Sequence, residues 1–271
     1  MARPSIAIVV TFFGQPPLWL PAFLLSCRQN PDVHWFIYTD FDIACTFPGN
    51  VVIRPTQLRE FNLRSSEAIG TTIDVQPSYL RKLSDLKPAY GLIFAEDLRP
   101  FDFWAYSELD IVWGEIRYFM TDQLLHAHDI VSSRHYKLSG HFTLLRNDAV
   151  MNRTFELIPD AVRLMADPRY LRLDESLFTR QLREGMERIP RPWLPRVYWE
   201  RELTMSAAYQ TSLGDSDTDN LWWRNGKTFD AQGRELMYLH FHRLKQCMST
   251  INFGFNDRPP AFAVNRRGVL A

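Results

Sequence analysis

The residues best suited to chemistry are two acids one position apart, Glu108 and Asp110. Alternate residues of an extended chain point to the same side, so both carboxylates can converge on one cation. Mg²⁺ and Mn²⁺ prefer oxygen ligands, and a cation there would neutralise a diphosphate as a sugar–phosphate bond breaks. Such triplets are also common at solvated strand ends. Here apolar segments flank the pair, Phe101–Tyr106 before it and Ile111–Gly114 after it, and buried carboxylates need a partner. We therefore predict a metal site.

A second cluster lies near the C-terminus and contains His240, His242 and Lys245. A neutral imidazole is a ligand for transition metals, and a lysine about one turn further on can hold phosphate as a point charge. The alternative for either histidine alone is a packed strand residue. Together with the two acids, these side chains are able to complete a site for a metal and a diphosphate.

The composition argues against some classes of partner. Lys and Arg together number 31, as do Asp and Glu, so the chain lacks the basic excess typical of nucleic-acid binding. Its three cysteines show neither a C-x-x-C pair nor a ligand-like spacing with histidine, which is typical of a reducing compartment. The apolar run Ile6–Val10 is too short for a signal peptide, and no later run reaches the roughly 18 apolar residues of a membrane span. We expect a soluble, cytoplasmic protein.

The elements that position these residues alternate between strands and helices. Ile6–Thr11 is a continuous, mostly β-branched run, which is typical of a strand buried on both faces of its sheet. Further strands are expected at Trp35–Asp40, Val51–Ile53, Phe101–Tyr106, Asp129–Ser132, Gly140–Leu145 and Met237–His242. Helices are expected at Leu18–Arg28, Leu58–Ile69, Tyr79–Ala95, Asp148–Met165 and Glu175–Gly185, the last with Asp174 as its N-cap.

This alternation predicts one doubly wound α/β domain. Residues 190–233 are rich in Trp, Asn, Asp and Gly with weak periodicity, so we expect loops and short elements there. We place the domain at residues 1–250 and a C-terminal tail at 251–271. Ligands of such sheets bind outside the carboxyl ends of the strands, so the residues that end each strand are candidates for the site.

Several segments resemble blocks of a known kind of protein. Lys82–Gly91, Phe101–Gly114, Ser139–Asn147 and Leu239–His242 look like an uncharacterised bacterial family of GT-A-type glycosyltransferases linked to polysaccharide biosynthesis. The arrangement is also similar, more distantly, to glycosyltransferase family eight, which carries a D-x-D motif. The resemblance implies a GT-A (Rossmann-like) fold, in which a mixed sheet is flanked by helices and a single domain has an irregular C-terminal part.

The resemblance also implies roles for individual side chains. Glu108 and Asp110 would bind Mn²⁺ or Mg²⁺, with His240 or His242 as a further ligand; Glu108 replaces the first Asp of a strict D-x-D. The residues implied to contact a nucleoside diphosphate sugar are Thr11, Phe12, Gly14 and Asp40 at the nucleoside, Lys82, Asp85, Lys87 and Lys245 at the ribose, diphosphate or sugar, and Ser139, Gly140 and His141 at the donor sugar. Asp174 and Glu175 occupy the place of an acidic residue near the acceptor, and they are the candidates for a catalytic base.

Several of these side chains also have a purely structural alternative. Lys82 and Asp85 are three residues apart, so they can form a surface ion pair, which stabilises a protein by under about 1 kcal/mol. Gly140 can serve the backbone at the start of a strand. Asp174 can act as a helix N-cap, which would leave Glu175 as the freer carboxylate.

The expected activity is therefore that of a glycosyltransferase of the hexosyltransferase type, using a nucleoside diphosphate sugar, first of all a uridine one. The acceptor would be a carbohydrate or a lipid-linked oligosaccharide in cell-surface polysaccharide or lipo-oligosaccharide synthesis, with at most peripheral membrane contact. Two alternatives remain. One is a nucleotidyltransferase, for which Gly14–Pro17 would be a poor phosphate loop. The other is a non-catalytic protein that binds a nucleotide sugar or a partner enzyme.

Overall fold

The computed structural model describes residues 2–42, 45–184, 194–213 and 219–271. Its largest element is a mixed sheet with the strand order β3-β2-β1-β4-β7-β6-β8. Strands β1 to β4 pair in parallel, whereas β7 runs antiparallel to both β4 and β6. The strands of this sheet are β1 (Ile6–Phe12), β2 (Val33–Thr39), β3 (Val51–Pro55), β4 (Phe103–Ser107), β6 (Ile130–Ser132), β7 (Phe142–Arg146) and β8 (Val197–Tyr198). The predicted mixed sheet of an α/β fold is confirmed.

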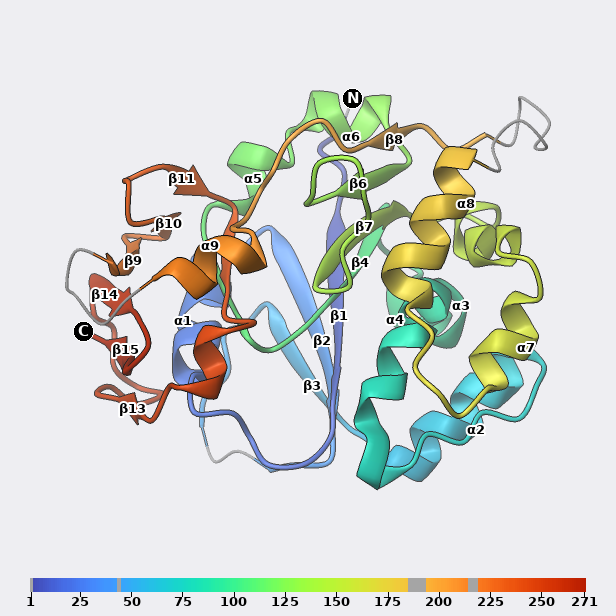
Figure 1. Cartoon of the computed structure of the whole chain (residues 1–271), viewed down its shortest axis with the longest axis horizontal. Coiled ribbons are helices and arrows are strands. Elements are labelled where there is room, and N and C mark those ends of the chain that lie inside the picture. Colours follow the sequence, from blue (N-terminus) through green and yellow to red (C-terminus); the bar gives the residue numbers. More distant parts are fainter. Residues whose placement is uncertain (1, 43–44, 185–193, 214–218) are drawn as a thin grey trace.

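Strand β1 explains why helices must cover both faces of this sheet. Its residues alternate between two hydrophobic cores: Ala7 and Val9 pack into one, and Ile6, Ile8 and Val10 into the other. Helices on the Val9 side are α2 (Leu58–Ile69), the 3₁₀ helix η1 (Pro77–Ala89), α3 (Tyr90–Ile93), α4 (Ala95–Leu98), the 3₁₀ helix η2 (Met151–Leu157), α7 (Ala161–Ala166), the π-helical turn η3 (Leu173–Leu177) and α8 (Phe178–Glu184). Helices on the Ile8 side are α1 (Leu20–Arg28), α5 (Ile116–Phe119) and α6 (Asp122–Ala127). Figure 1 shows the two groups on opposite sides of the central strands.

The C-terminal third forms a second sheet of short strands, ordered β11-β10-β9-β14-β15-β13. Its core is built on Trp223, whose ring stacks on Phe262, and it packs against Ala22 and Leu25 of α1. The elements here are α9 (Ala207–Ser212), β9 (Leu221–Arg224), β10 (Lys227–Phe229), β11 (Glu235–Leu236), the 3₁₀ turn η7 (Leu244–Gln246), β13 (Thr250–Ile251), β14 (Ala261–Val264) and β15 (Gly268–Leu270). The sequence predicts that residues 251–271 form a C-terminal tail. Within this range, β14 and β15 pair in the second sheet. The domain boundary at residue 250 stays a prediction.

A two-stranded ribbon connects the two sheets. Strand β12 (Tyr238–His240) pairs antiparallel with β5 (Ile111–Trp113), and His240 lies opposite Ile111. The backbone N–H of Phe241 then donates to the carbonyl of Asp110 at 2.8 Å. Since only residues 108–110 separate β4 from β5, the ribbon brings the end of the chain to the carboxyl edge of the central sheet.

Two of the predicted helices differ in detail from the structure. The helix expected over Asp148–Met165 is interrupted, because Pro159 holds Ile158 in an extended conformation with ψ of 120°. Asp174 is not an N-cap: it lies inside η3, which begins after Arg172 with a left-handed φ of 62°. No helix in the described part of the chain is both long and apolar enough to span a membrane.

Candidate metal and anion site

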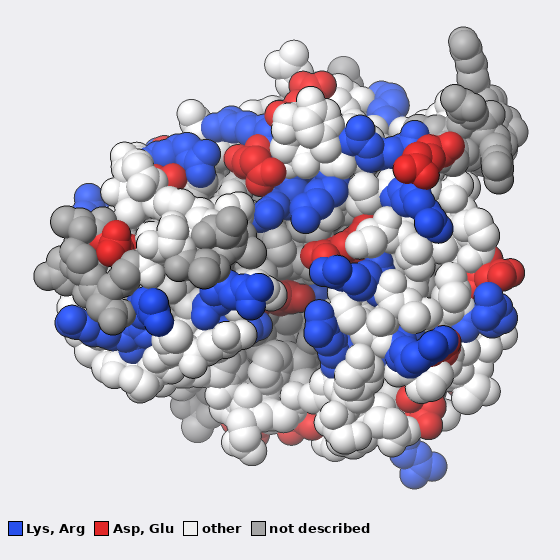
Figure 2. Space-filling view, viewed as in Figure 1, with Lys and Arg blue, Asp and Glu red and all other residues white. Residues whose placement is uncertain are grey.

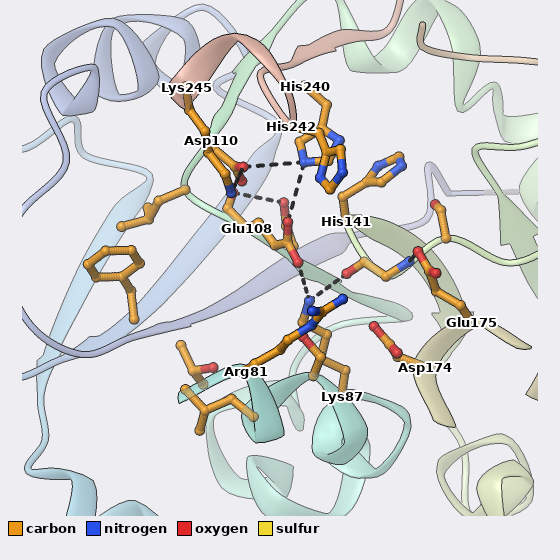
Figure 3. Close-up of a pocket in the computed structure, with 18 of the residues that line it drawn as sticks. Arg81, Lys87, Glu108, Asp110, His141, Asp174, Glu175, His240, His242 and Lys245 are labelled. Carbon is orange, nitrogen blue, oxygen red and sulfur yellow. Dashed lines mark hydrogen bonds and ion pairs between the residues drawn. The ribbon is translucent and has the colours of Figure 1, made fainter. Parts of the chain in front are cut away.

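A cavity of about 860 Å³ opens where the central sheet, η1, η3 and the β12 segment meet. In the space-filling view it is the hollow at the centre of the face, with Lys and Arg side chains around it and acidic side chains deeper inside (Figure 2). The predicted site residues that line it are Thr11, Phe12, Lys87, Glu108, Asp110, Ser139, Gly140, His141, Asp174, Glu175, His240, His242 and Lys245. Figure 3 shows that most of the charged ones point into a common space. The strand ends therefore converge on one site, as expected for an α/β sheet.

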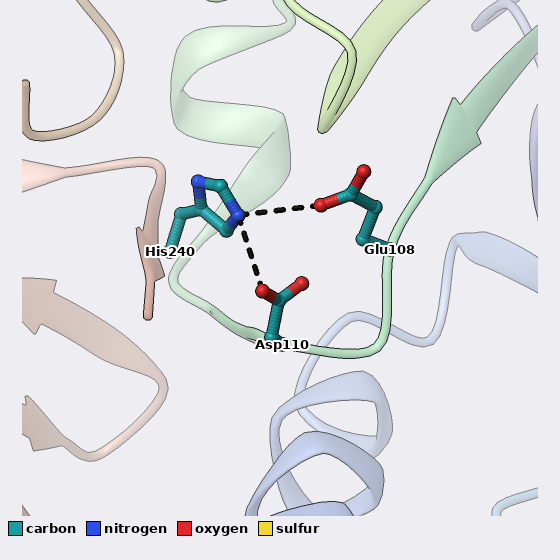
Figure 4. Close-up of side chains that lie close together, drawn as sticks. All are labelled: Glu108, Asp110 and His240. Carbon is teal, nitrogen blue, oxygen red and sulfur yellow. Dashed lines mark ion pairs between the residues drawn. The ribbon is translucent and has the colours of Figure 1, made fainter. Parts of the chain in front are cut away.

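Glu108, Asp110 and His240 meet at the floor of this cavity (Figure 4). The Nε2 atom of His240 lies 3.3 Å from a carboxylate oxygen of Glu108 and 3.4 Å from one of Asp110. One ligand atom from each residue lies within 4.8 Å of the others. The buried Nε2 atom makes no hydrogen bond, so the ring has capacity for a ligand. Two carboxylates and an imidazole in this arrangement fit a divalent cation such as Mn²⁺ or Mg²⁺.

Two lysines hold the carboxylates of this cluster. Lys87 Nζ donates to Glu108 at 2.6 Å, and Lys245 Nζ donates to Asp110 at 2.6 Å. Burial alone would raise the pKa of both carboxyls. The positive charges of Lys87 at Glu108, and of His240 and Lys245 at Asp110, nevertheless keep both pKa values below their ordinary range. Both groups are therefore ionised and able to ligate a cation.

The two carboxylates in turn act on His240. Burial would lower the pKa of its imidazole, but Asp110 and Glu108 outweigh burial and raise that pKa to about 9. The charge of the protonated ring is then balanced by the two carboxylates, and metal binding at Nε2 requires release of a proton. The neighbouring ring of His141, whose centroid is 4.2 Å away, has its pKa lowered by burial and by the charge of His240.

Of the two histidines predicted as metal ligands, the structure brings only His240 to the acids. His242 is exposed at the cavity rim, with its ring centroid 5.7 Å from that of His240, and the ligand cluster found among the described residues does not include it.

The helix η1 separates residues that face the cavity from residues that do not. A 3₁₀ helix has three residues per turn, so side chains three apart lie on the same face. Arg81, Ser84 and Lys87 follow this spacing and line the cavity. Lys82 and Asp85 follow the same spacing one position later, and they lie outside the cavity lining.

Lys82 and Asp85 instead form a buried ion pair of 2.9 Å beneath the cavity wall. Lys82 Nζ also donates to two backbone carbonyls, of Leu164 and Arg169, each at 3.1 Å. The carboxylate of Asp85 accepts from the backbone N–H groups of residues 171 and 173 at 2.8 and 2.9 Å. The pair therefore holds the segment that leads into η3, and its polar atoms are used internally.

Gly14 and Asp40 also lie outside the cavity lining, at the loops that follow β1 and β2. The backbone N–H of Gly14 donates to Asp40 at 2.7 Å, and its φ of 103° favours glycine. This bond orders the loop beyond Thr11 and Phe12, which do line the cavity.

Asp174 and Glu175 form the opposite wall together with Gly140. A Cβ atom at Gly140 would lie 2.2 Å from Asp174 Oδ2, so any larger residue requires the side chain of Asp174 to shift. The N–H of Gly140 donates to Glu175 at 3.1 Å. Burial, assisted by neighbouring carboxylates, raises the pKa of Asp174 to about 8, although Lys87 opposes the shift. Asp174 is thus protonated at neutral pH and suited to donate a hydrogen bond, whereas Glu175 is partly exposed to the cavity.

Ser139 lines the cavity with its hydroxyl turned inward, donating to the carbonyl of Phe142 at 2.7 Å. His141 Nδ1 lies 2.7 Å from the hydroxyl of Tyr238 on β12. These contacts tie the start of β7 to the ribbon that carries His240.

Several basic residues that line the cavity were not predicted from the sequence. Among the described residues, the Lys and Arg side chains that line it are Arg81, Lys87, Arg134, Lys137, Arg172, Arg243 and Lys245. The corresponding acids are Glu108, Asp110, Asp174 and Glu175. The one available signal was position, since Arg134 and Lys137 directly precede the block that begins at Ser139. Loop side chains have no periodicity from which their direction can be predicted.

The sequence matches the model of one protein family over residues 8–265, described as a family of unknown function (DUF6625). No curated protein shows a significant match. Among solved structures, the chain is similar to the galactosyltransferase LgtC in complex with donor and acceptor sugar analogues, with 9% identity, a TM-score of 0.44 and 86% of each chain covered. It is also similar to mouse xyloside xylosyltransferase 1 in its apo form, with 13% identity, a TM-score of 0.46, and 87% of this chain and 97% of that one covered.

Proposed function

The chain belongs to the DUF6625 family of unknown function, and we propose that it is a metal-dependent glycosyltransferase that moves a hexosyl group from a nucleoside diphosphate donor to a carbohydrate acceptor. The observation that carries this proposal is the meeting of Glu108, Asp110 and His240 at the floor of a cavity that is otherwise rich in Lys and Arg side chains. A carboxylate pair fits a divalent metal, and the surrounding lysines and arginines fit the anionic diphosphate that such a metal accompanies.

Glu108, Asp110 and His240 would hold Mn²⁺ or Mg²⁺. When bound, the cation would neutralise negative charge on the departing diphosphate. Lys87 and Lys245 already contact the two carboxylates at 2.6 Å, so they supply fixed positive charge at the same place. Charges that are positioned before the reaction need no reorganisation during it.

The nucleoside of the donor is assigned to the end of β1, where Thr11 and Phe12 line the cavity at the carboxyl edge of the sheet. A uridine donor is the first candidate. Glu175, held by the N–H of Gly140, is placed to accept the proton of an acceptor hydroxyl. Asp174, protonated at neutral pH, is suited to donate a hydrogen bond to a substrate oxygen.

The biological setting is proposed from composition and resemblance alone. The acceptor would be a saccharide or a lipid-linked oligosaccharide in cell-surface polysaccharide or lipo-oligosaccharide synthesis. The protein would act in the cytoplasm with at most peripheral contact to the membrane.

The test is an assay of UDP release from several UDP-hexoses, with Mn²⁺ and with a chelator. UDP release that requires the metal and is lost in Asp110→Asn supports the proposal. The matched control is Asp160→Asn, which removes an exposed acid whose partner is Arg163 at 3.0 Å, away from the cavity. Transfer unaffected by Asp110→Asn would remove the metal mechanism. Release of pyrophosphate from UTP and a hexose 1-phosphate, with no UDP released from a UDP-hexose, would indicate a nucleotidyltransferase, and donor binding without turnover would indicate a non-catalytic protein.

A further inference from the structure

The described lining of the cavity contains more positive charge than its proposed donor requires. Its Lys and Arg side chains number seven and its Asp and Glu side chains four, an excess of three before any proton on Asp174 or His240 is counted. The charges of a nucleoside diphosphate and a divalent cation roughly cancel each other. Binding of donor and metal therefore leaves the excess in place, and it favours a second ligand that is negative.

Part of this excess lies on a tight hairpin at residues 134–137. Arg134 and Lys137 form an antiparallel bridge, which places their side chains on the same face, and both line the cavity. The ammonium groups of Lys87 and Lys245 are paired with the carboxylates of the metal cluster, whereas Arg134 lies 3.4 Å from Glu202, outside the cavity lining. The hairpin charges are therefore separate from the proposed metal.

The hairpin is ordered before any ligand binds. Arg134 Nη1 donates to the carbonyl of Met205 at 2.8 Å, and the backbone N–H of Arg134 donates to the hydroxyl of Ser132 at 3.1 Å. Tyr136 has a φ of 61°, a conformation that a bulky residue adopts only when its surroundings require it. This order lowers the entropic cost of binding a ligand at the hairpin.

The two side chains also have unused capacity. Arg134 Nε is buried, and although it lies 3.4 Å from Glu202 it makes no hydrogen bond. The ammonium of Lys137 makes no ion pair or hydrogen bond with any residue in the described part of the chain, and this side chain is exposed at the rim. An oxyanion beside Lys137 Nζ would pair with this free charge, and the guanidinium of Arg134, which lines the same cavity, would add a second positive charge.

We propose that the acceptor is an anionic saccharide whose carboxylate or phosphate group is bound by Arg134 and Lys137. This inference deepens the proposed function and rests on it, because it takes the cavity to bind a sugar acceptor beside the donor. Carboxylate and phosphate share the chemistry that the hairpin recognises, so the experiment separates them.

The experiment is calorimetric titration of the full chain with glucuronic acid, glucose 6-phosphate and neutral glucose, each with and without UDP and Mn²⁺. We expect one charged sugar to bind about ten-fold more tightly than glucose at low salt, with the preference falling as salt is raised. Lys137→Met should remove most of this preference and Lys137→Arg should retain it. The control Arg180→Met removes an exposed charge on α8 outside the cavity and should leave the preference unchanged.

The inference is overturned if neither charged sugar binds more tightly than glucose, or if the preference survives in Lys137→Met. It is also overturned if Lys137→Met weakens UDP binding as much as binding of the charged sugar, because the hairpin would then serve the donor. Failure of the wild-type protein to bind UDP with Mn²⁺ counts against the proposed function instead, while the titrations without UDP still decide whether a charged sugar is preferred.

Discussion

The helix η1 contributes lysines to two buried ion pairs that have opposite consequences. In the Lys82–Asp85 pair, at 2.9 Å, the side chains are 4% and 0% exposed, and backbone groups take up the remaining hydrogen-bonding capacity. In the Lys87–Glu108 pair, at 2.6 Å, the carboxylate is 32% exposed and faces the cavity. The two pairs have similar length and chemistry. A pair is therefore available to a ligand when its carboxylate has unused hydrogen-bonding capacity and faces a cavity.

The largest expected effect on stability concerns the buried Lys82–Asp85 pair. Asp85→Asn leaves the buried ammonium of Lys82 without its counter-charge, so we expect a loss of about 3–5 kcal/mol in the free energy of unfolding. Urea unfolding measures this loss. The double variant Lys82→Met with Asp85→Leu removes both charges and should recover part of the stability; a single variant as stable as the wild type would contradict the assignment of this pair to folding.

The cluster of Glu108, Asp110 and His240 should respond in the opposite way, with a large loss of activity and a smaller loss of stability. Asp110→Asn removes a proposed metal ligand, so we expect weaker Mn²⁺ binding and a fall of about 10²–10³ in UDP release. Its free energy of unfolding should fall by less than that of Asp85→Asn, because the partner Lys245 is 38% exposed and can be solvated, and Glu108 remains beside His240. Calorimetric titration with Mn²⁺ alone checks binding independently of turnover. Unchanged Mn²⁺ affinity would show that Asp110 is no ligand.

A smaller effect is expected where the cavity wall is most tightly packed. In Gly140→Ala the new Cβ would lie 2.2 Å from Asp174 Oδ2, so the wall must move at a cost of about 1–3 kcal/mol. Thermal unfolding measures this cost. Gly49→Ala is the matched control, because a Cβ there meets nothing within 4 Å. Equal stability of the two variants would mean that the close approach to Asp174 is not maintained.

A last effect concerns the slope of stability against pH. Asp174 has a pKa of about 8 in the folded chain against an ordinary value of 3.8, so between these values the folded state holds a proton that the unfolded state releases. Stability therefore falls as pH rises through this window. Asp174→Asn carries no such proton and should show a flatter profile. Parallel pH profiles of the two proteins in urea unfolding would exclude the raised pKa.

The main sheet could be predicted from the sequence because strands buried on both faces leave a continuous apolar run. Ile6–Thr11 and Phe103–Tyr106 both carry this signal, and the second leads to Glu108. The second sheet could not, because its strands are short and depend on pairing between residues far apart in the chain, such as Trp223 with Phe262.

The sequence predicted which kinds of residue form the candidate site, but not which individual side chains reach the cavity. Lys82 and Lys87 both stand in a block of basic and acidic residues, and the sequence does not show which of them reaches the cavity. The choice depends on the three-residue period of a 3₁₀ helix, which places Lys87 with Arg81 on the cavity face. Local composition does not distinguish that period from the 3.6 of an α-helix over so few turns.

The pairing of β12 with β5 also orders events in the life of the chain. During synthesis, Glu108 and Asp110 emerge from the ribosome together with the first sheet, but His240 joins them only after the ribbon has closed. A prematurely terminated chain that ends before β12 thus carries both acids and no imidazole beside them. Under the proposed function, the capacity to bind the cation is in this way deferred until β12 has paired with β5.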